Sequence, residues 1–173
     1  QAGGSLALFA EEYTLRNVIV LGRSMAIGPT QFASLHGLLV LALLPLFLFS
    51  ATRRRRRSTE PSTPVKMVWG YVATAAAFIL LAAAGLHGGD TSRVSPGWLT
   101  GCYLLLSVAE LLLGPFGLSL VTQIAPPDHT GQAVGLWFAA AAVGNLAAGG
   151  LGLLWGRWPN HRYFALLALA SLG

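Results

Sequence analysis

A single acidic residue, Glu110, stands inside a long apolar segment. It is the thirteenth of 27 residues in the run Trp98–Ile124, and about 20 apolar residues suffice for a helix to cross a bilayer. We therefore expect Glu110 near the middle of the membrane, where a bare carboxylate costs about 2.5 kcal/mol or more. It must be protonated, be paired, or face a wet cavity. We interpret it as a site for a substrate amine or a proton; the alternative is a structural partner for a polar group on a neighbouring helix.

Gly114 and Pro115 follow Glu110 at four and five positions. Because proline has no N–H to donate within a helix, the helix is predicted to bend or loosen just after the carboxylate. Transporters often bind substrate where a spanning helix is interrupted near the midplane, although an ordinary proline kink is the alternative. Pro45 predicts a second bend in the run Phe32–Ala51. Gly114, Pro115 and Pro45 are the candidate gating positions.

Three further side chains within apolar runs can interact with a small molecule. His36 lies near the start of its run, where it can touch a substrate, carry a proton or hydrogen-bond a neighbouring helix. Trp137 and Asn145 fall on one helix face, eight residues apart, with Ala141 between them. The indole could line a pocket to which Asn145 supplies an amide. The alternative is an aromatic anchor at the membrane interface.

The elements that carry these residues are long apolar helices. The chain of 173 residues is 54% hydrophobic and 10% charged, whereas soluble domains have about 25% charged residues. The runs lack the strict alternation of a transmembrane barrel. We predict an all-α membrane protein, a fragment of about five spanning helices plus partial ends, because Gln1–Ala10 and Tyr163–Gly173 are apolar but short. The four full runs are Phe32–Ala51, Met67–Leu86, Trp98–Ile124 and Ala133–Trp155.

Basic residues are concentrated between two of the runs. The net charge is +5, and six of the eleven Lys and Arg residues lie in the segment 52–66, including Arg53–Arg57 and Lys66. A positive-inside loop explains this pattern better than a nucleic-acid site does. We therefore expect a multi-pass protein of the plasma (inner) membrane with loop 52–66 in the cytoplasm, and anionic lipids near Arg53–Arg57.

The sequence gives little support to enzyme functions. It contains no hydrolase elbow, phosphate-binding loop, metal-ligand spacing or dinucleotide fingerprint. Cys102 is the single cysteine, which excludes an intrachain disulfide and argues against a metal site. No metal or cofactor is expected.

Four stretches resemble the proton-dependent oligopeptide transporter family of the major facilitator superfamily, in the family's order. They are QAGGSLALFA (Gln1–Ala10), EPSTPVKMVWG (Glu60–Gly70), AELLLGPFGLSLVTQIAP (Ala109–Pro126) and GLWFAAAAVGNLAAG (Gly135–Gly149). The resemblance implies the C-terminal half of a transporter. Its parts would be the end of helix seven at 1–13, helix eight at about 30–51, the basic loop 52–66, helix nine at 67–86, helix ten at 98–124, helix eleven at 133–155 and the start of helix twelve at 162–173.

The resemblance also implies a function and a set of contacts. It implies proton-driven symport of di- and tripeptides, powered by a proton gradient, together with the N-terminal six-helix bundle of the same protein. Glu110 resembles the glutamate that holds the peptide's α-amino group, and Trp137 and Phe138 resemble pocket-lining aromatics. The expected substrate-contacting positions are Glu110, Trp137, Phe138, His36, Gly114, Ala141, Ser5 and Asn145.

Several positions depart from the family pattern. His36 stands where the family usually has asparagine, Ala7 replaces another asparagine, Gly114 replaces a serine and Ala141 a polar residue. These changes predict an altered substrate preference. Two alternatives therefore remain: a same-family carrier of another small charged metabolite, and a non-transporting membrane scaffold or receptor domain.

Overall fold

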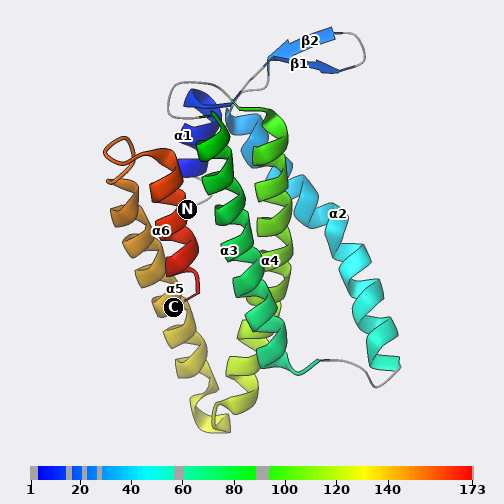
Figure 1. Ribbon diagram of the computed structural model, residues 1–173. Helices are drawn as coiled ribbons and strands as arrows, with labels where there is room; N and C mark the ends of the chain where they lie inside the picture. The colour runs from blue at the N-terminus through cyan, green and yellow to red at the C-terminus, as the bar shows by residue number, and fades with distance from the viewer. Residues whose placement is uncertain are drawn as a thin grey trace.

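The computed structural model describes residues 4–14, 17–20, 23–26, 29–56, 61–88 and 94–172 (Figure 1). The elements, in chain order, are α1 (Ser5–Glu12), β1 (Asn17–Val20), β2 (Arg23–Ala26), α2 (Pro29–Arg56), α3 (Thr63–Gly88), α4 (Pro96–Ile124), the 3-10 turn η1 (Pro127–His129), α5 (Thr130–Gly152) and α6 (Asn160–Ala170).

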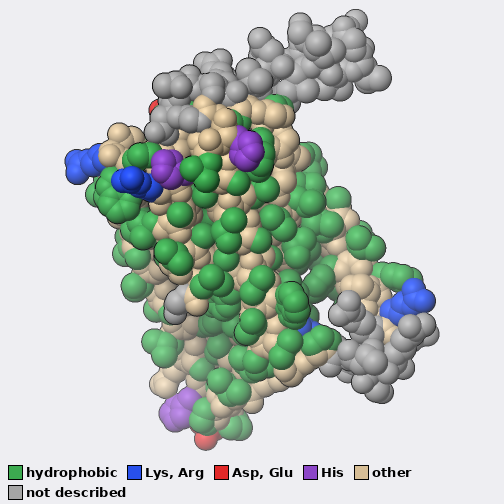
Figure 2. Space-filling model, in the orientation of Figure 1, with side chains coloured by type: hydrophobic (Ala, Val, Ile, Leu, Met, Phe, Trp, Pro, Cys, Tyr) green, Lys and Arg blue, Asp and Glu red, His purple; other side chains and the backbone are tan. Residues whose placement is uncertain are grey.

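Four helices within the described residues, α2 to α5, are long and apolar enough to cross a membrane. α2 and α4 end at the same end of the molecule where α3 and α5 begin, so the chain runs up and down through the bundle (Figure 1). On the face shown in Figure 2, hydrophobic side chains cover the length of the helices, and the charged side chains lie towards the two ends. The predicted helical membrane fold is confirmed, with four spanning helices in the described part rather than about five.

The core lies where α3 packs against α4 and α6. A Cβ atom added at Gly70 of α3 would lie 2.7 Å from Cγ of Leu113, so the two backbones approach closely because this position has no side chain. Five aromatic rings join α1, α6 and the turn that follows α5, with centroid distances between neighbouring rings from 5.3 to 6.5 Å. They belong to Phe9, Tyr13, Trp155, Tyr163 and Phe164.

Several helix boundaries in the structure differ by a few residues from the predicted ones. α2 continues to Arg56 and α3 begins at Thr63, so the predicted loop 52–66 is helical at both of its ends. Arginine is a good helix former, and a proline in the first turn of a helix loses no hydrogen bond, which explains why helix continues into both flanks. α5 begins at Thr130 and ends at Gly152 rather than spanning 133–155, and α6 begins at Asn160 rather than 162.

The described chain also contains a β-hairpin that was not predicted. β1 and β2 are antiparallel, with Asn17 paired to Ala26 and Val20 to Arg23. The sequence of β1, Asn-Val-Ile-Val, is rich in β-branched residues, which favour strands. The segment is too short to cross a membrane, and its sequence carries no long apolar run. The all-α class of the bundle stands, and this strand pair is an addition to it between α1 and α2.

Pro45 and Pro115, the two prolines at which bends were predicted, lie inside uninterrupted helices. Pro45 is within α2 and Pro115 within α4, so neither residue breaks its helix. α2 nevertheless leans away from α3 and α4 towards its C-terminal end (Figure 1). A local bend at Pro45 or Pro115 stays a prediction.

Candidate functional site

Glu110 and His36 meet across α2 and α4. Nε2 of His36 lies 3.4 Å from Oε2 of Glu110, and the side chains are 21% and 60% exposed. The two groups form an ion pair whenever the imidazole is protonated. The carboxylate therefore has a partner and also faces an open surface of the bundle. Sequence reasoning had placed these two residues in separate helices without relating them.

Polar groups from α4 surround this contact. The ring of Tyr103 lies 5.7 Å from that of His36. The hydroxyl of Ser107 donates to the carbonyl of Tyr103 at 2.8 Å and to that of His36 at 3.5 Å. The Tyr103 hydroxyl is buried without a hydrogen-bond partner among the described residues. Sequence reasoning missed Tyr103 and Ser107, although they precede Glu110 by seven and three positions and so share its helix face.

Trp137 of α5 rests against the backbone of α4. A Cβ atom added at Gly117 would lie 2.6 Å from Cζ2 of the indole, so a glycine is needed for the ring to approach this closely. Gly117 is two helical turns beyond Glu110 on the same face, roughly 10 Å along the axis. The half-buried Trp137 therefore borders the face that carries the carboxylate. Gly117 was not singled out from the sequence.

The remaining predicted contacts divide into exposed and buried positions. Phe138 is 59% exposed, and Gly114, Ala141 and Asn145 are exposed as well. Ser5, in contrast, is only 4% exposed. In this conformation its burial argues against direct contact with a substrate.

The described side chains offer no group of three or more His, Cys, Asp or Glu residues that could hold a metal ion. The groups present at the site are one carboxylate, one imidazole and the aromatic side chains beside them. Such a set can bind a cation and exchange a proton.

Comparisons with known proteins give one consistent result. A family model described as the POT family matches residues 1–159. The peptide transporter YePEPT of Yersinia enterocolitica is 38% identical over 150 residues, which cover 86% of this chain and 29% of that protein. Dipeptide and tripeptide permease A of Escherichia coli is 30% identical over 137 residues, covering 79% of this chain and 27% of the permease. The chain thus spans about a third or less of these relatives, which are transporters and not enzymes.

Solved structures match over almost the whole chain. A crystal structure of the peptide transporter POT in complex with sulfate is 28% identical, with a TM-score of 0.84, and the match covers 97% of this chain and 33% of that one. A POT family transporter in complex with a thioalcohol conjugated peptide has a TM-score of 0.86 over 96% of this chain and 34% of the other. At 23% identity, the second match supports the fold alone.

Proposed function

Because the chain belongs to the POT family of transporters, we propose that it is the C-terminal helical bundle of a proton-coupled symporter of di- and tripeptides. The observation that carries this proposal is the exposed carboxylate of Glu110, paired with His36 on the α4 face that Trp137 borders. Relatives named as peptide transporters support the substrate class.

In the proposed mechanism, Glu110 binds the α-amino group of the peptide. Two unit charges about 4 Å apart attract by about 1 kcal/mol in water and by about 4 kcal/mol near a protein surface. A carboxylate that is 60% exposed lies between these limits. A protonated His36 and the peptide ammonium compete for the same carboxylate, so loss of the proton from His36 frees Glu110 for the substrate. His36 would in this way affect both substrate preference and proton use.

The aromatic and small residues of α4 and α5 would shape the remainder of the cavity. Trp137 and Phe138 offer apolar surface to peptide side chains, and Asn145 offers an amide. Rocking of this bundle against the N-terminal six-helix bundle would provide alternating access. We assign the bends that accompany this motion to Gly114–Pro115 and to Pro45.

The proposed topology places the α2–α3 connection in the cytoplasm, in a plasma (inner) membrane. The charge of Arg53–Arg57 supports this side. Anionic lipids would be the neighbours of this basic run.

Uptake by the full-length protein in proteoliposomes tests the proposal. We expect an inward proton gradient to accumulate a radiolabelled dipeptide, a protonophore to prevent this accumulation, and Glu110→Gln to abolish it. Asp128→Asn is the matched control, because Asp128 is an exposed carboxylate in η1. A normal rate in Glu110→Gln would show that the site assignment is wrong, and accumulation that ignores the protonophore would exclude proton coupling.

The second candidate is a same-family carrier of another small charged metabolite. Glycine at 114 and alanine at 141 remove polar groups from exposed positions of the site, and this favours a substrate with fewer polar contacts than a peptide backbone makes. Competition assays distinguish the peptide symporter from this second candidate. If the second candidate is correct, small amines inhibit uptake by the protein and dipeptides do not. A scaffold or receptor would accumulate neither.

A further inference from the structure

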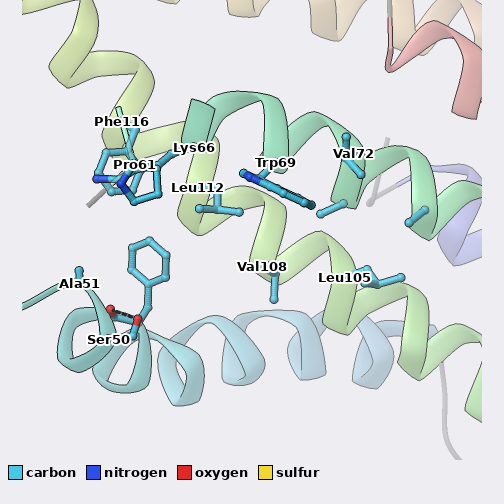
Figure 3. Close-up of a pocket in the computed structure, with 13 residues that line it drawn as sticks. Ser50, Ala51, Pro61, Lys66, Trp69, Val72, Leu105, Val108, Leu112 and Phe116 are labelled. Carbon is cyan, nitrogen blue, oxygen red and sulfur yellow. Dashed lines mark hydrogen bonds between the residues drawn. The ribbon is translucent and has the colours of Figure 1, made fainter. Parts of the chain in front are cut away.

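A hollow lies on the side of α4 that faces away from Glu110. It is an open cavity of about 670 Å³ bounded by α2, α3 and α4 (Figure 3). Its α4 lining recurs every three or four residues and so forms one stripe of the helix, whereas Glu110 and Gly117 belong to the opposite stripe. The α4 residues that line the cavity are Leu105, Val108, Leu112 and Phe116. The cavity is therefore separate from the candidate substrate site.

The lining of this cavity is almost entirely apolar. Phe47 and Ala51 of α2 and Trp69 and Ala73 of α3 contribute to it. Ser50 also lines it, but its hydroxyl donates to the carbonyl of Phe47 at 2.8 Å and needs no further partner (Figure 3). The chemistry inside the cavity suits a hydrocarbon chain.

The length of the cavity matches one leaflet of a bilayer. From Leu105 to Phe116 the α4 axis advances roughly 16 Å, and half of a hydrocarbon core about 30 Å thick is about 15 Å. Its lining includes Ser50 and Ala51 near the end of α2 and Lys66 near the start of α3, so the cavity lies towards that end of the bundle. A lipid chain could enter it from the leaflet at that end.

Positive charge lies at the same end. Nζ of Lys66, which lines the cavity, lies 4.3 Å from the ring centroid of Phe116, a cation–π contact. Arg53 is exposed and follows Ser50 by three residues, so the two share one side of α2. The run Arg53–Arg57 adds further charge. Basic pockets between spanning helices bind anionic headgroups.

We propose that this cavity binds an acyl chain of an anionic phospholipid, with the lipid phosphate at Lys66 and Arg53. The apolar lining takes the chain, and the two cations favour a headgroup with net negative charge over a zwitterionic one, whose own cation would meet them. The lipid fills the space from which α2 leans away and holds this half of α2 against α3 and α4. The proposal does not depend on what the protein transports.

Native mass spectrometry of the full-length protein, purified with equal amounts of phosphatidylglycerol and phosphatidylcholine, tests the proposal. Lys66→Gln removes the cation at the cavity, and Ala73→Phe fills the cavity. Arg157→Gln removes a cation from the opposite end of the bundle. Ile79→Phe enlarges a side chain of α3 that is 57% exposed and lies outside the cavity lining.

We expect phosphatidylglycerol to be retained in preference to phosphatidylcholine. Lys66→Gln should lower its occupancy about fivefold, the effect of one basic residue near an anionic surface, and Ala73→Phe should remove it. Both control variants should bind as the wild type does. Equal retention of the two lipids overturns the proposal, and so does unchanged occupancy in Lys66→Gln and Ala73→Phe. The proposal is also wrong if no lipid is bound because a segment of the protein fills the cavity.

A second measurement covers the case in which Ala73→Phe does not fold. Phosphatidylglycerol with brominated acyl chains should quench the fluorescence of Trp69 more than brominated phosphatidylcholine does. The difference should disappear in Trp69→Phe and fall in Lys66→Gln. Equal quenching by the two lipids refutes the preference for an anionic headgroup.

Discussion

Gly117 should tolerate no side chain, whereas Gly114, one turn earlier in α4, should accept one. In Gly117→Ala the new methyl carbon would lie 2.6 Å from Cζ2 of Trp137, while ordinary contact begins at 3.4 Å. The indole must therefore move by roughly 1 Å, and overpacking of this kind costs about 1–3 kcal/mol. No described atom lies within 4 Å of a Cβ added at Gly114.

The comparison of the two alanine variants isolates the contact with Trp137. Both glycines lie inside α4, so each substitution gains about 1 kcal/mol of helix propensity. The variants should then differ by the full overpacking term, with Gly117→Ala about 1–3 kcal/mol less stable than Gly114→Ala. Thermal unfolding of the full-length protein in one detergent measures this as a lower apparent midpoint for Gly117→Ala. Equal midpoints would refute the assigned contact and, with it, the position of the indole beside the Glu110 face.

Two further predictions concern the site and the topology. His36→Asn removes the group 3.4 Å from Glu110, so competition uptake with a panel of dipeptides should show a changed preference, and an unchanged ranking would contradict a role for His36 in specificity. For topology, a membrane-impermeant maleimide added to intact cells should label Arg157→Cys and not Ser62→Cys. The opposite pattern would reverse the assigned orientation. The native Cys102 is fully buried and should stay unlabelled.

Hydrophobicity and charge predicted the spanning helices, but not where they end. The runs that became α3 and α4 were placed within four residues of their observed bounds, because burial in lipid requires a continuous apolar stretch. The ends of the helices depend on helix propensity and on capping interactions, and the length of an apolar run indicates neither. Arg53–Arg56 continue α2 although they are charged. The hairpin of β1 and β2 was missed because four-residue strands carry little periodic signal.

The sequence identified the candidate chemical groups better than their contacts. Glu110 was singled out as a carboxylate in an apolar helix, and His36 as a polar group in another. The distance of 3.4 Å between their side chains depends on how α2 crosses α4. The sequences of the two helices do not indicate this crossing. Gly117 and Ser107 were missed because a glycine or serine in a spanning helix usually only permits close packing. Ser5 was included by resemblance, and its burial depends on the packing of α1.

The two faces of α4 explain why so few polar groups appear in this bundle. One face carries Glu110 and the glycine that receives Trp137, while the other carries only apolar side chains, which line the cavity beside Lys66. A charge on the second face would lie among apolar groups, where it is expensive unless it is paired. If this division is correct, the carboxylate introduced by Val108→Glu should destabilise the full-length protein strongly and should not create a second cation site. The exposed Glu110, in contrast, should be replaceable by glutamine with little loss of stability. If the unfolding midpoints of Val108→Glu and Glu110→Gln fall by the same amount, this division of the helix is wrong.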